Sequence, residues 1–364
     1  MKPTRLIVMA CCLMMAHTLF SQVRKYSNAF LDIGVGARGL ALSSAQVATV
    51  SDATATYWNP SSLTRIRSVV DIAAMHAEYF AGIAKYDYVG VAVPLQDYHR
   101  FLGFSFIRFG VDDIPNTLEL FEDDGSINYD NVQSFSVADW AFMLSYAQKL
   151  KIRETHLALG GNVKVIYRIA GDFATAWGFG LDLSATMDIK QWRLGIMARD
   201  VSGTFNAWSF SFTEREKEIL TKTDNVIPEN SLEITVPKFI VGAAYEFNIR
   251  NRFFILPELD VEMTTDKKRN VPIRTNAVSF DPRFGLELNY NRLVYLRAGI
   301  GNIQKSTDDD GKAITTFQPN IGIGLQIKSF GVDYAFTDIG NQSDALYSHV
   351  VSLHLGIPKP KKKN

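Results

Sequence analysis

Apolar residues alternate with small or charged residues along long runs of this chain. From Trp177 to Ile189 every second residue is apolar, and the residues between them are Gly, Ser, Thr or Asp. The pattern recurs at 192–199, 239–248, 283–290, 320–327 and 330–337. Successive side chains of a strand point to opposite faces, so this period predicts strands with one apolar face. Runs of roughly nine to thirteen residues are long enough to cross a bilayer at a tilt.

Fourteen such segments are spaced along the sequence. They are 67–79, 83–95, 100–110, 138–149, 155–168, 173–189, 191–202, 237–249, 252–264, 280–291, 293–303, 314–328, 329–337 and 347–357. Connections after even-numbered segments are short, and most of those after odd-numbered segments are long. A soluble all-β protein is the alternative, but it gives no reason for this parity. The pattern predicts a fourteen-stranded antiparallel transmembrane β-barrel over 67–357, with both termini periplasmic.

The two ends of the chain have the composition of segments outside the barrel. Residues 1–21 combine basic Lys2 and Arg5 with a short apolar run and predict a signal peptide cleaved after Ser21. Both cysteines lie in it, so the mature chain has no disulfide and no thiolate metal site. Removing Lys2 and Arg5 leaves 36 basic against 38 acidic residues, which argues against nucleic-acid binding. Residues 358–364 form a basic tail, expected to be periplasmic.

Residues 22–66 precede the first segment and are rich in Gly and Ala. A lumen of fourteen strands is too wide for side chains alone to fill, which favours a plug over an ordinary N-terminal loop. Asp52 is a candidate N-cap for a short helical turn. Pro60 disfavours a helical Asn59, so this turn is expected to end near Trp58. The residues expected to shape the plug are Gly34, Gly36, Gly39, Asp52, Trp58, Asn59 and Pro60.

The face opposite the apolar one carries charges of both signs. They are Asp182, Arg193, Arg199, Glu246, Glu258, Asp260, Glu262, Arg283, Glu287, Arg297 and Asp333. Mixed signs at this density predict ion-pair networks that brace a filled interior, because unpaired buried charges are costly. The alternative is a water-filled lumen in which the pairs are incidental.

No catalytic, cofactor or metal motif is found in the sequence. There is no G-x-S-x-G, H-E-x-x-H or P-loop, and the histidines are scattered. The acidic stretches Glu122–Gly125 and Asp308–Gly311 lack EF-hand spacing and are interpreted as solvated loops. We therefore expect a protein that is not an enzyme and has no cofactor.

The connection 203–236 combines aromatic residues with a helical pattern. Its aromatic residues are Phe205, Trp208, Phe210 and Phe212. Thr213 and Glu216 then form a capping box for a charged helix that runs to Lys222. Such a cluster is a candidate docking surface. A lid folded over the barrel mouth is the alternative.

The stretch from Phe30 to Leu63, FLDIGVGARGLALSSAQVATVSDATATYWNPSSL, together with the fourteen segments, resembles the PorV/PorQ family of Bacteroidota outer-membrane proteins. Family members read closer to GARALGMGGA and DDATA-x-YWNPAGL, and this chain departs at Gly39–Ala45 and Ser61–Ser62. The resemblance implies a relative of FadL-type barrels, integral to the outer membrane. It also implies a role in type IX secretion or sorting, with translocon components or secreted cargo C-terminal domains as partners. The alternative is a FadL-like importer of hydrophobic small molecules.

Overall fold

The computed structural model describes residues 27–359, except 81, 96–97, 123, 153–154, 266–268, 308–311 and 338–346. The predicted signal peptide lies outside the described residues. So do the acidic stretch Asp308–Gly311 and the basic tail beyond Lys359.

The described strands form one antiparallel sheet that closes on itself, because β1 is hydrogen-bonded to β18 on one side and to β2 on the other. The strands are β1 (Val70–Tyr79), β2 (Ala84–Pro94), β3 (Arg100–Asn116), β4 (Gln133–Ile152), β5 (Thr155–Ala170), β6 (Ala174–Ile189), β7 (Trp192–Arg199), β8 (Thr204–Phe210), β9 (Ser231–Thr235), β10 (Lys238–Tyr245), β11 (Phe247–Ile249), β12 (Phe253–Thr264), β13 (Ile273–Arg274), β14 (Ser279–Tyr290), β15 (Val294–Thr307), β16 (Ala313–Ile327), β17 (Phe330–Thr337) and β18 (Ser348–Ile357).

In the described part of the chain these strands occupy fourteen positions around the barrel. We call each position a stave, whether one strand or several consecutive strands fill it. β7 and β8 follow one another along β6 and form one stave. β9, β10 and β11 form the next, since β9 pairs with β8, β10 with β7, and both β10 and β11 with β12. β13 adds only two residues beside β14. The predicted fold class is confirmed, and each predicted segment corresponds to one stave.

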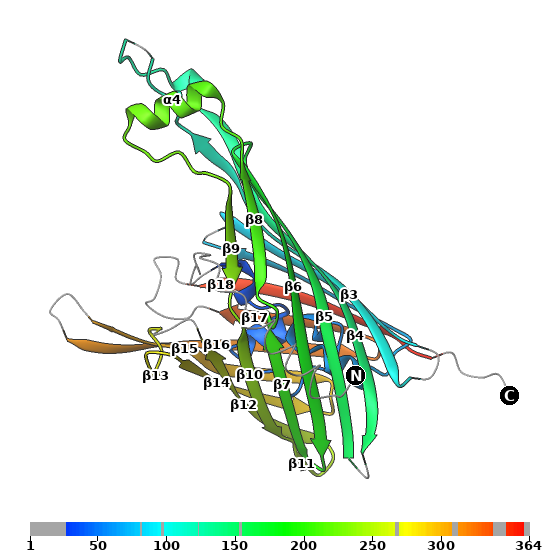
Figure 1. Cartoon of the computed structure of the whole chain (residues 1–364). Helices are drawn as coiled ribbons and strands as arrows, with labels where there is room; N and C mark the ends of the chain where they lie inside the picture. The colour runs from blue at the N-terminus through cyan, green and yellow to red at the C-terminus, as the bar shows by residue number, and fades with distance from the viewer. Residues whose placement is uncertain are drawn as a thin grey trace, which may run out of the picture.

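The described helices are short. They are the 3₁₀-helices η1 (Ala29–Asp32), η2 (Pro60–Arg65) and η3 (Tyr129–Asn131), and the α-helices α2 (Ala37–Ala41), α3 (Ala55–Trp58) and α4 (Glu214–Lys222). None of the helices in the described part of the chain is long and apolar enough to cross a membrane. In Figure 1 the blue N-terminal helices lie within the barrel, while α4 stands well away from it.

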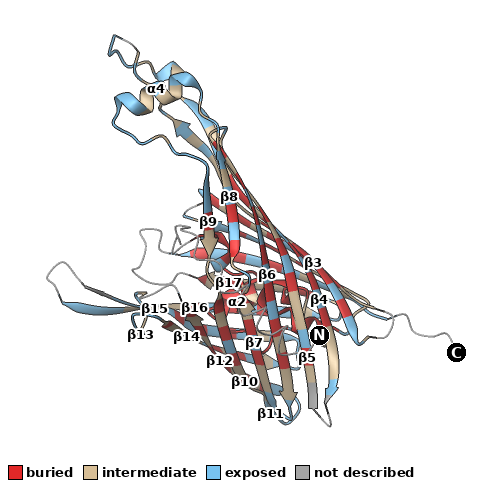
Figure 2. Cartoon of the chain, viewed as in Figure 1, coloured by how far each residue is buried: buried red, intermediate tan, exposed pale blue. Residues whose placement is uncertain are grey.

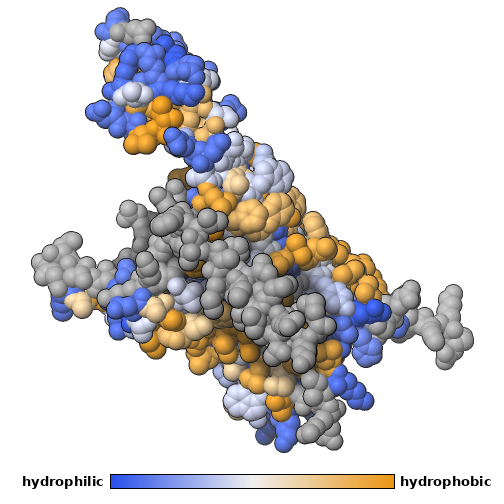
Figure 3. Space-filling model, in the orientation of Figure 1, coloured by the Kyte–Doolittle hydropathy of each residue, from blue (hydrophilic) through white to orange (hydrophobic). Residues whose placement is uncertain are grey.

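The period-two pattern sorts side chains between the outside and the lumen. On β6, Trp177, Phe179 and Leu181 are exposed on the outer face, whereas Asp182 is buried on the inner face. Figure 3 shows apolar residues over the barrel body and hydrophilic ones at both ends, and Figure 2 shows buried residues along the strands. An apolar outer face is what a bilayer requires of a spanning barrel.

Several predicted loops are shorter than expected because their flanking strands continue beyond the apolar band. β3 runs on to Asn116 and β4 begins at Gln133, so the connection predicted at 111–137 shrinks to 117–132. The predicted loop 203–236 is likewise reduced to 211–230 by β8 and β9. Backbone hydrogen bonds between two neighbouring strands do not require an apolar outer face, so the strands can continue beyond the membrane into water. The alternation of apolar and polar residues is weaker in these extensions.

Candidate functional site: an N-terminal plug inside the barrel

The segment from Ser27 to Ile66, here called the plug, lies inside the barrel. α3 and η2 contact β3 and β4, and α2 contacts β15 to β18 on another side of the lumen. Almost all of its residues are buried. The plug therefore contacts the barrel wall on several sides of the lumen.

Glycines in the plug stand where the Trp58 ring leaves no room for a side chain. A Cβ on Gly39 would lie 2.9 Å from the Trp58 ring, and one on Gly34 would lie 3.0 Å from it. Gly34 and Gly36 also have φ angles of +96° and +82°, which favour glycine. Gly34 and Gly39 are thus brought together with Trp58, whereas a Cβ on Gly36 would meet Thr54 at 3.4 Å.

The Tyr-Trp-Asn-Pro stretch anchors the turns of the plug to one another. Trp58 Nε1 donates to the Val35 carbonyl at 2.8 Å, and the Tyr57 hydroxyl donates to the Leu31 carbonyl at 2.6 Å. Asn59 Nδ2 donates to the Val47 carbonyl at 2.9 Å. As predicted, α3 ends at Trp58, because Asn59 before Pro60 is extended at φ −164°.

The N-cap prediction for Asp52 is wrong by two residues. The N-cap of α3 is Thr54, whose side chain makes no capping hydrogen bond. The Asp52 carboxylate instead accepts the Thr54 backbone N–H at 2.8 Å. An Asp that binds the backbone two residues on forms an Asx-turn, which here precedes the helix.

One side of the plug is apolar and faces β1 to β5. Trp58 and Leu63 belong to a single buried cluster with Tyr88, Phe101 and Ile166 of the wall. Polar contacts also cross this side: the Thr56 and Tyr88 hydroxyls lie 2.8 Å apart, Ala53 N donates to Asp71 Oδ1 at 2.8 Å, and Asn162 Nδ2 donates to the Thr56 carbonyl at 2.7 Å. The Tyr88 hydroxyl also donates to the Ala53 carbonyl, so it is satisfied within the cluster.

The other side of the plug is held by carboxylates of β12 and β14. Val47 N donates to Asp260 Oδ2 at 3.0 Å and Ala48 N donates to Glu258 Oε1 at 2.7 Å. Arg38 Nε donates to Glu287 Oε2 at 2.8 Å. We call residues 38–49 and these partners the ionic side.

Wall residues extend the ionic side beyond the plug. Arg297 Nε contacts the same Glu287 Oε2 at 2.8 Å, and its Nη1 contacts Asp333 Oδ1 at 2.5 Å. Nearer the short turns, Arg65 Nη2 binds Asp188 Oδ1 at 2.6 Å. Several of the charges predicted on the lumen face therefore form ion pairs with each other or with the plug. For this part of the wall, the filled-interior interpretation agrees with the structure.

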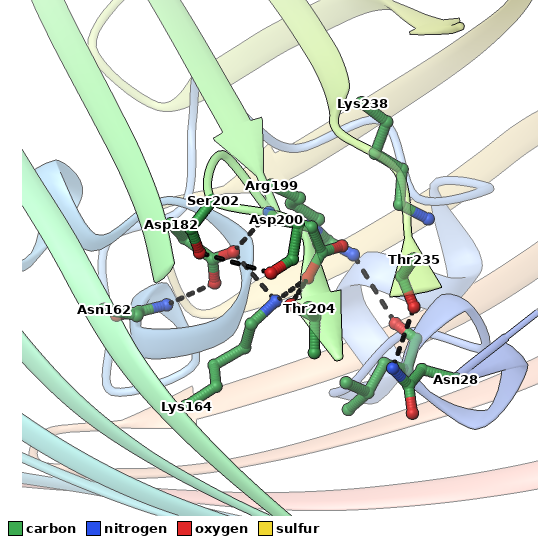
Figure 4. A network of polar contacts seen from close by, with 12 residues as sticks. Asn28, Asn162, Lys164, Asp182, Arg199, Asp200, Ser202, Thr204, Thr235 and Lys238 are labelled. Atoms are coloured by element: carbon green, nitrogen blue, oxygen red, sulfur yellow. Dashed lines mark hydrogen bonds and ion pairs between the residues drawn. The ribbon is translucent and has the colours of Figure 1, made fainter. Parts of the chain in front are cut away.

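A second polar network lies between the plug and the wall near the end of β7 (Figure 4). Lys164 Nζ contacts Asp182 Oδ1 at 2.8 Å and Asp200 Oδ1 at 2.5 Å. Arg199 Nη1 donates to the Tyr57 hydroxyl at 3.1 Å. Lys238 forms an ion pair with Asp32 of the plug.

A cavity beside this network has a volume of about 20 Å³. Its lining combines three cations and three carboxylates with the apolar side chains of Leu31, Tyr57 and Met143; the charged residues are Lys164, Arg199, Lys238, Asp32, Asp182 and Asp200. Such a volume holds about one water molecule. A pocket for a small organic ligand needs roughly 300 Å³ or more and a mostly apolar lining. As the plug stands, this cavity cannot hold a hydrophobic molecule.

The same network marks an interruption in the wall that the sequence analysis missed. β7 ends at Arg199 and β8 begins at Thr204, while β9 ends at Thr235 and β10 begins at Lys238. Asp200 and Gly203 there have positive φ angles of 56° and 69°. Pro237, which cannot donate to a strand ladder, was the available sequence signal.

Three of the predicted docking aromatics, Phe205, Trp208 and Phe210, lie on β8, and Phe212 follows it; the structure does not bring all four together. Phe205 is on the outer face of β8, with its ring centroid 5.7 Å from that of Phe179. Trp208, Phe210 and Phe212 form a separate stack on the other face, with ring centroids 6.1 and 6.3 Å apart. Phe205 is therefore not part of one cluster with the other three.

Beyond this stack the chain forms a projection, here called the tower, from residues 117–132 and 213–230. α4 has the predicted capping box, with Thr213 as N-cap and Glu216 reaching back to it. Arg215 Nε contacts Glu119 Oε1 at 3.3 Å and so joins the two parts. The sequence of 117–132 contains five acidic residues and no basic one.

No protein-family model matches the chain, and no curated protein is significantly similar to it in sequence. Solved structures do resemble it. The Pseudomonas putida toluene transporter TodX is 12% identical with a TM-score of 0.55, over 90% of this chain and 99% of that one. The CymD monoaromatic hydrocarbon channel is 12% identical with a TM-score of 0.55, over 90% and 98%. A Pseudomonas aeruginosa FadL homologue is 11% identical with a TM-score of 0.52, over 88% and 97%. The chain has the fold of these FadL-like barrels.

Proposed function

We propose that this chain is an integral outer-membrane barrel that admits small hydrophobic molecules past its plug. The observation that carries the proposal is a FadL-like barrel whose lumen is closed by its own N-terminal segment. Two of the barrels it resembles are described as a toluene transporter and a monoaromatic hydrocarbon channel. That likeness favours transport over the secretion role that the sequence alone favoured.

Passage requires part of the plug to move. The cavity beside the plug has a volume of about 20 Å³, which is too small for an organic ligand while the plug is in place. Val47, Ala48 and Arg38 are held by hydrogen bonds to wall carboxylates, which water can replace at a net cost of about 1.5–3 kcal/mol each. Val47 and Ala48 also pack against the wall, but each in a small cluster of three buried residues. Trp58 and its cluster lose their apolar contacts if exposed. The moving part is therefore the ionic side, and the apolar side stays in place.

The proposed orientation follows the lengths of the connections. Short turns are periplasmic and long loops external in outer-membrane barrels. Val70 begins β1 and Ile357 ends β18 at the short-turn end, where these two residues are paired. Both termini of the barrel then face the periplasm and the tower faces the exterior.

Uptake across a lipopolysaccharide-containing membrane tests the proposal. The chain is produced in a Gram-negative host that lacks its own fatty-acid and hydrocarbon barrels, and initial uptake of labelled toluene and oleate is measured. Uptake faster than with the empty vector supports transport. Uptake equal to the empty vector, with folded barrel present in the outer membrane, contradicts it.

A second candidate is protein docking in type IX secretion or sorting. It is supported by the resemblance to the PorV/PorQ family and by the tower, which exposes Phe121, Ile127 and Tyr129 beside acidic residues. Native purification of the tagged chain tests it, with a matched variant in which residues 117–132 are replaced by a short Gly-Ser turn. Translocon components or cargo C-terminal domains that copurify with the intact chain alone would support docking. Recovery of the barrel without them would count against it.

A further inference from the structure

The two ends of the barrel have opposite charge. The described connections at the short-turn end are 67–69, 95, 98–99, 190–191, 250–252, 291–293, 328–329 and 358–359, and they contain seven basic residues and no acidic one. The described connections at the opposite end are 80, 82–83, 117–122, 124–132, 171–173, 211–230, 265, 269–278, 312 and 347, and they contain six basic and ten acidic residues. The whole chain has no net formal charge, so the asymmetry is one of placement.

The basic residues of the short-turn end lie on turns that are hydrogen-bonded to their neighbours. Glu246 N donates to the Gln191 carbonyl at 3.0 Å, and Asn291 N donates to the Arg252 carbonyl at 2.6 Å. Further round, Gln326 N donates to the Leu293 carbonyl at 2.8 Å. These bonds join successive turns into a basic rim, whose exposed cations include Lys190, Arg250, Arg252, Arg292 and Lys328.

The basic rim adjoins the apolar outer surface. Trp192, Phe253, Tyr290 and Phe330 are exposed on the strands that the rim turns connect. Aromatic residues of this kind occupy the membrane–water interface. Cations one or two residues beyond them therefore lie at the level of the lipid headgroups.

Carboxylates near the rim do not neutralise it. Glu246 contacts Arg193 on the lumen side and Arg292 at 3.7 Å, so Arg292 is partly compensated. The sequence places Asp97 and Glu154 in two other turns. Lys190, Arg250, Arg252 and Lys328 belong to turns whose own sequences contain no acidic residue.

We propose that the basic rim binds the phosphate groups of anionic phospholipids in the leaflet at the short-turn end. Exposed cations at headgroup depth attract anionic lipids. A soluble phosphate is the weaker candidate, because the cations are spread along the edge of the apolar surface and do not converge on one pocket. The acidic opposite end repels the same headgroups. The proposal does not depend on what passes through the barrel.

Lipid selectivity tests the proposal. The full chain is reconstituted in nanodiscs of phosphatidylcholine, and spin-labelled phosphatidylglycerol and phosphatidylcholine with identical acyl chains are compared for the fraction immobilised by the protein. The rim variant carries Lys190→Gln, Arg250→Gln, Arg252→Gln and Lys328→Gln. The matched control removes four cations from the opposite end, by Lys217→Gln, Lys222→Gln, Arg274→Gln and Lys305→Gln.

We expect wild type and the control to prefer phosphatidylglycerol by roughly fivefold, the effect of about one interfacial cation. The rim variant is expected to lose this preference, and so is wild type at about 1 M salt, where screening acts within about 3 Å. Equal association of both lipids with wild type would overturn the proposal. An equal loss in the control would overturn it as well. Resistance of each variant to unfolding by SDS without heating verifies that the barrel is folded.

Discussion

The apolar and ionic sides of the plug meet the same barrel wall through different chemistry. On the apolar side, Trp58 is 2% exposed and packs in a cluster with wall residues such as Phe101. On the ionic side, backbone N–H groups and Arg38 are held by Glu258, Asp260 and Glu287. Apolar burial is lost in proportion to the area exposed to water. Each hydrogen bond to a carboxylate can be exchanged for bonds to water at a net cost of about 1.5–3 kcal/mol.

This difference assigns separate roles to the two sides. The apolar side keeps the plug in the barrel, and the ionic side determines whether the lumen is closed. The carboxylates also give the plug one register, because each accepts from a particular backbone or guanidinium group. The following predictions test whether the two sides behave separately.

Truncation on the apolar side is expected to have the largest effect. Trp58→Ala removes a buried ring and its hydrogen bond to Val35, at a cost of about 3–5 kcal/mol to packing of the plug. The plug should become sensitive to trypsin while the barrel remains resistant to SDS. Trp192→Ala, which truncates an indole 50% exposed on the outer face, is the control and should leave the plug protected. A protected plug in Trp58→Ala would contradict the anchoring role.

Loss of a charge on the ionic side is expected to act on closure more than on retention. Glu287→Gln leaves Arg38 without its carboxylate and costs about 1.5–3 kcal/mol. Conductance of the reconstituted barrel in planar bilayers should rise, with the plug still resistant to trypsin near Trp58. The matched control is Glu246→Gln, at the short-turn end, which should stay closed. If Glu287→Gln instead releases the whole plug, the two sides are not separable.

A polar substitution on the apolar side gives a smaller effect. Thr56→Val removes the hydroxyl that meets Tyr88 and keeps the shape of the side chain, at a cost of about 1 kcal/mol. Urea unfolding of the plug in lipid vesicles, followed by proteolysis, should show this loss without any rise in conductance. Thr175→Val on β6 serves as the control. A rise in conductance would mean that the apolar side also controls closure.

The weakest effect is expected far from the plug, in the tower. Hydrogen bonds from Asn128 and Asn131 lower the pKa of the Glu122 carboxyl. A lowered folded-state pKa means that the contribution of Glu122 to loop order is present above the ordinary carboxyl pKa, about 4.3, and is lost as pH falls through the lowered value. Hydrogen exchange of residues 117–132, corrected for its intrinsic pH dependence, should accelerate only in that acidic range. Glu122→Gln should reduce the pH dependence, with the remainder due to Asp124, whose pKa is lowered by hydrogen bonds from Ser126, and conductance should not change.

The wall of this protein could be predicted from sequence because a bilayer imposes a rule on every spanning strand. One face must be apolar over about ten residues, and β6 follows that rule from Trp177 to Ile189. The end of α3 at Trp58 was predictable too, since a proline restricts the residue before it. The bilayer determines the first feature, and the backbone restriction imposed by Pro60 determines the second.

Features that depend on distant partners could not be predicted in the same way. Nothing near Asp260 in the sequence indicates that it accepts a hydrogen bond from Val47, 213 residues away. The extension of β8 beyond the membrane depends on pairing with β6 and β9, so Phe205 was assigned to a loop. The interruption near Asp200 breaks two neighbouring strands at the same level, and in the sequence only Pro237 pointed to it.

A reversible covalent lock on the ionic side tests most directly whether its movement opens the barrel. A Cβ on Gly301 would lie 3.1 Å from Ser43 Cβ, close to the spacing of a disulfide, about 3.5–4.5 Å, and the mature chain is predicted to have no other cysteine. Uptake of toluene is measured in cells that carry Ser43→Cys with Gly301→Cys, before and after reduction. The account predicts no uptake above the empty vector when the disulfide is formed, and wild-type uptake after reduction. Equal uptake by the oxidised and reduced forms, at complete cross-linking, would contradict it.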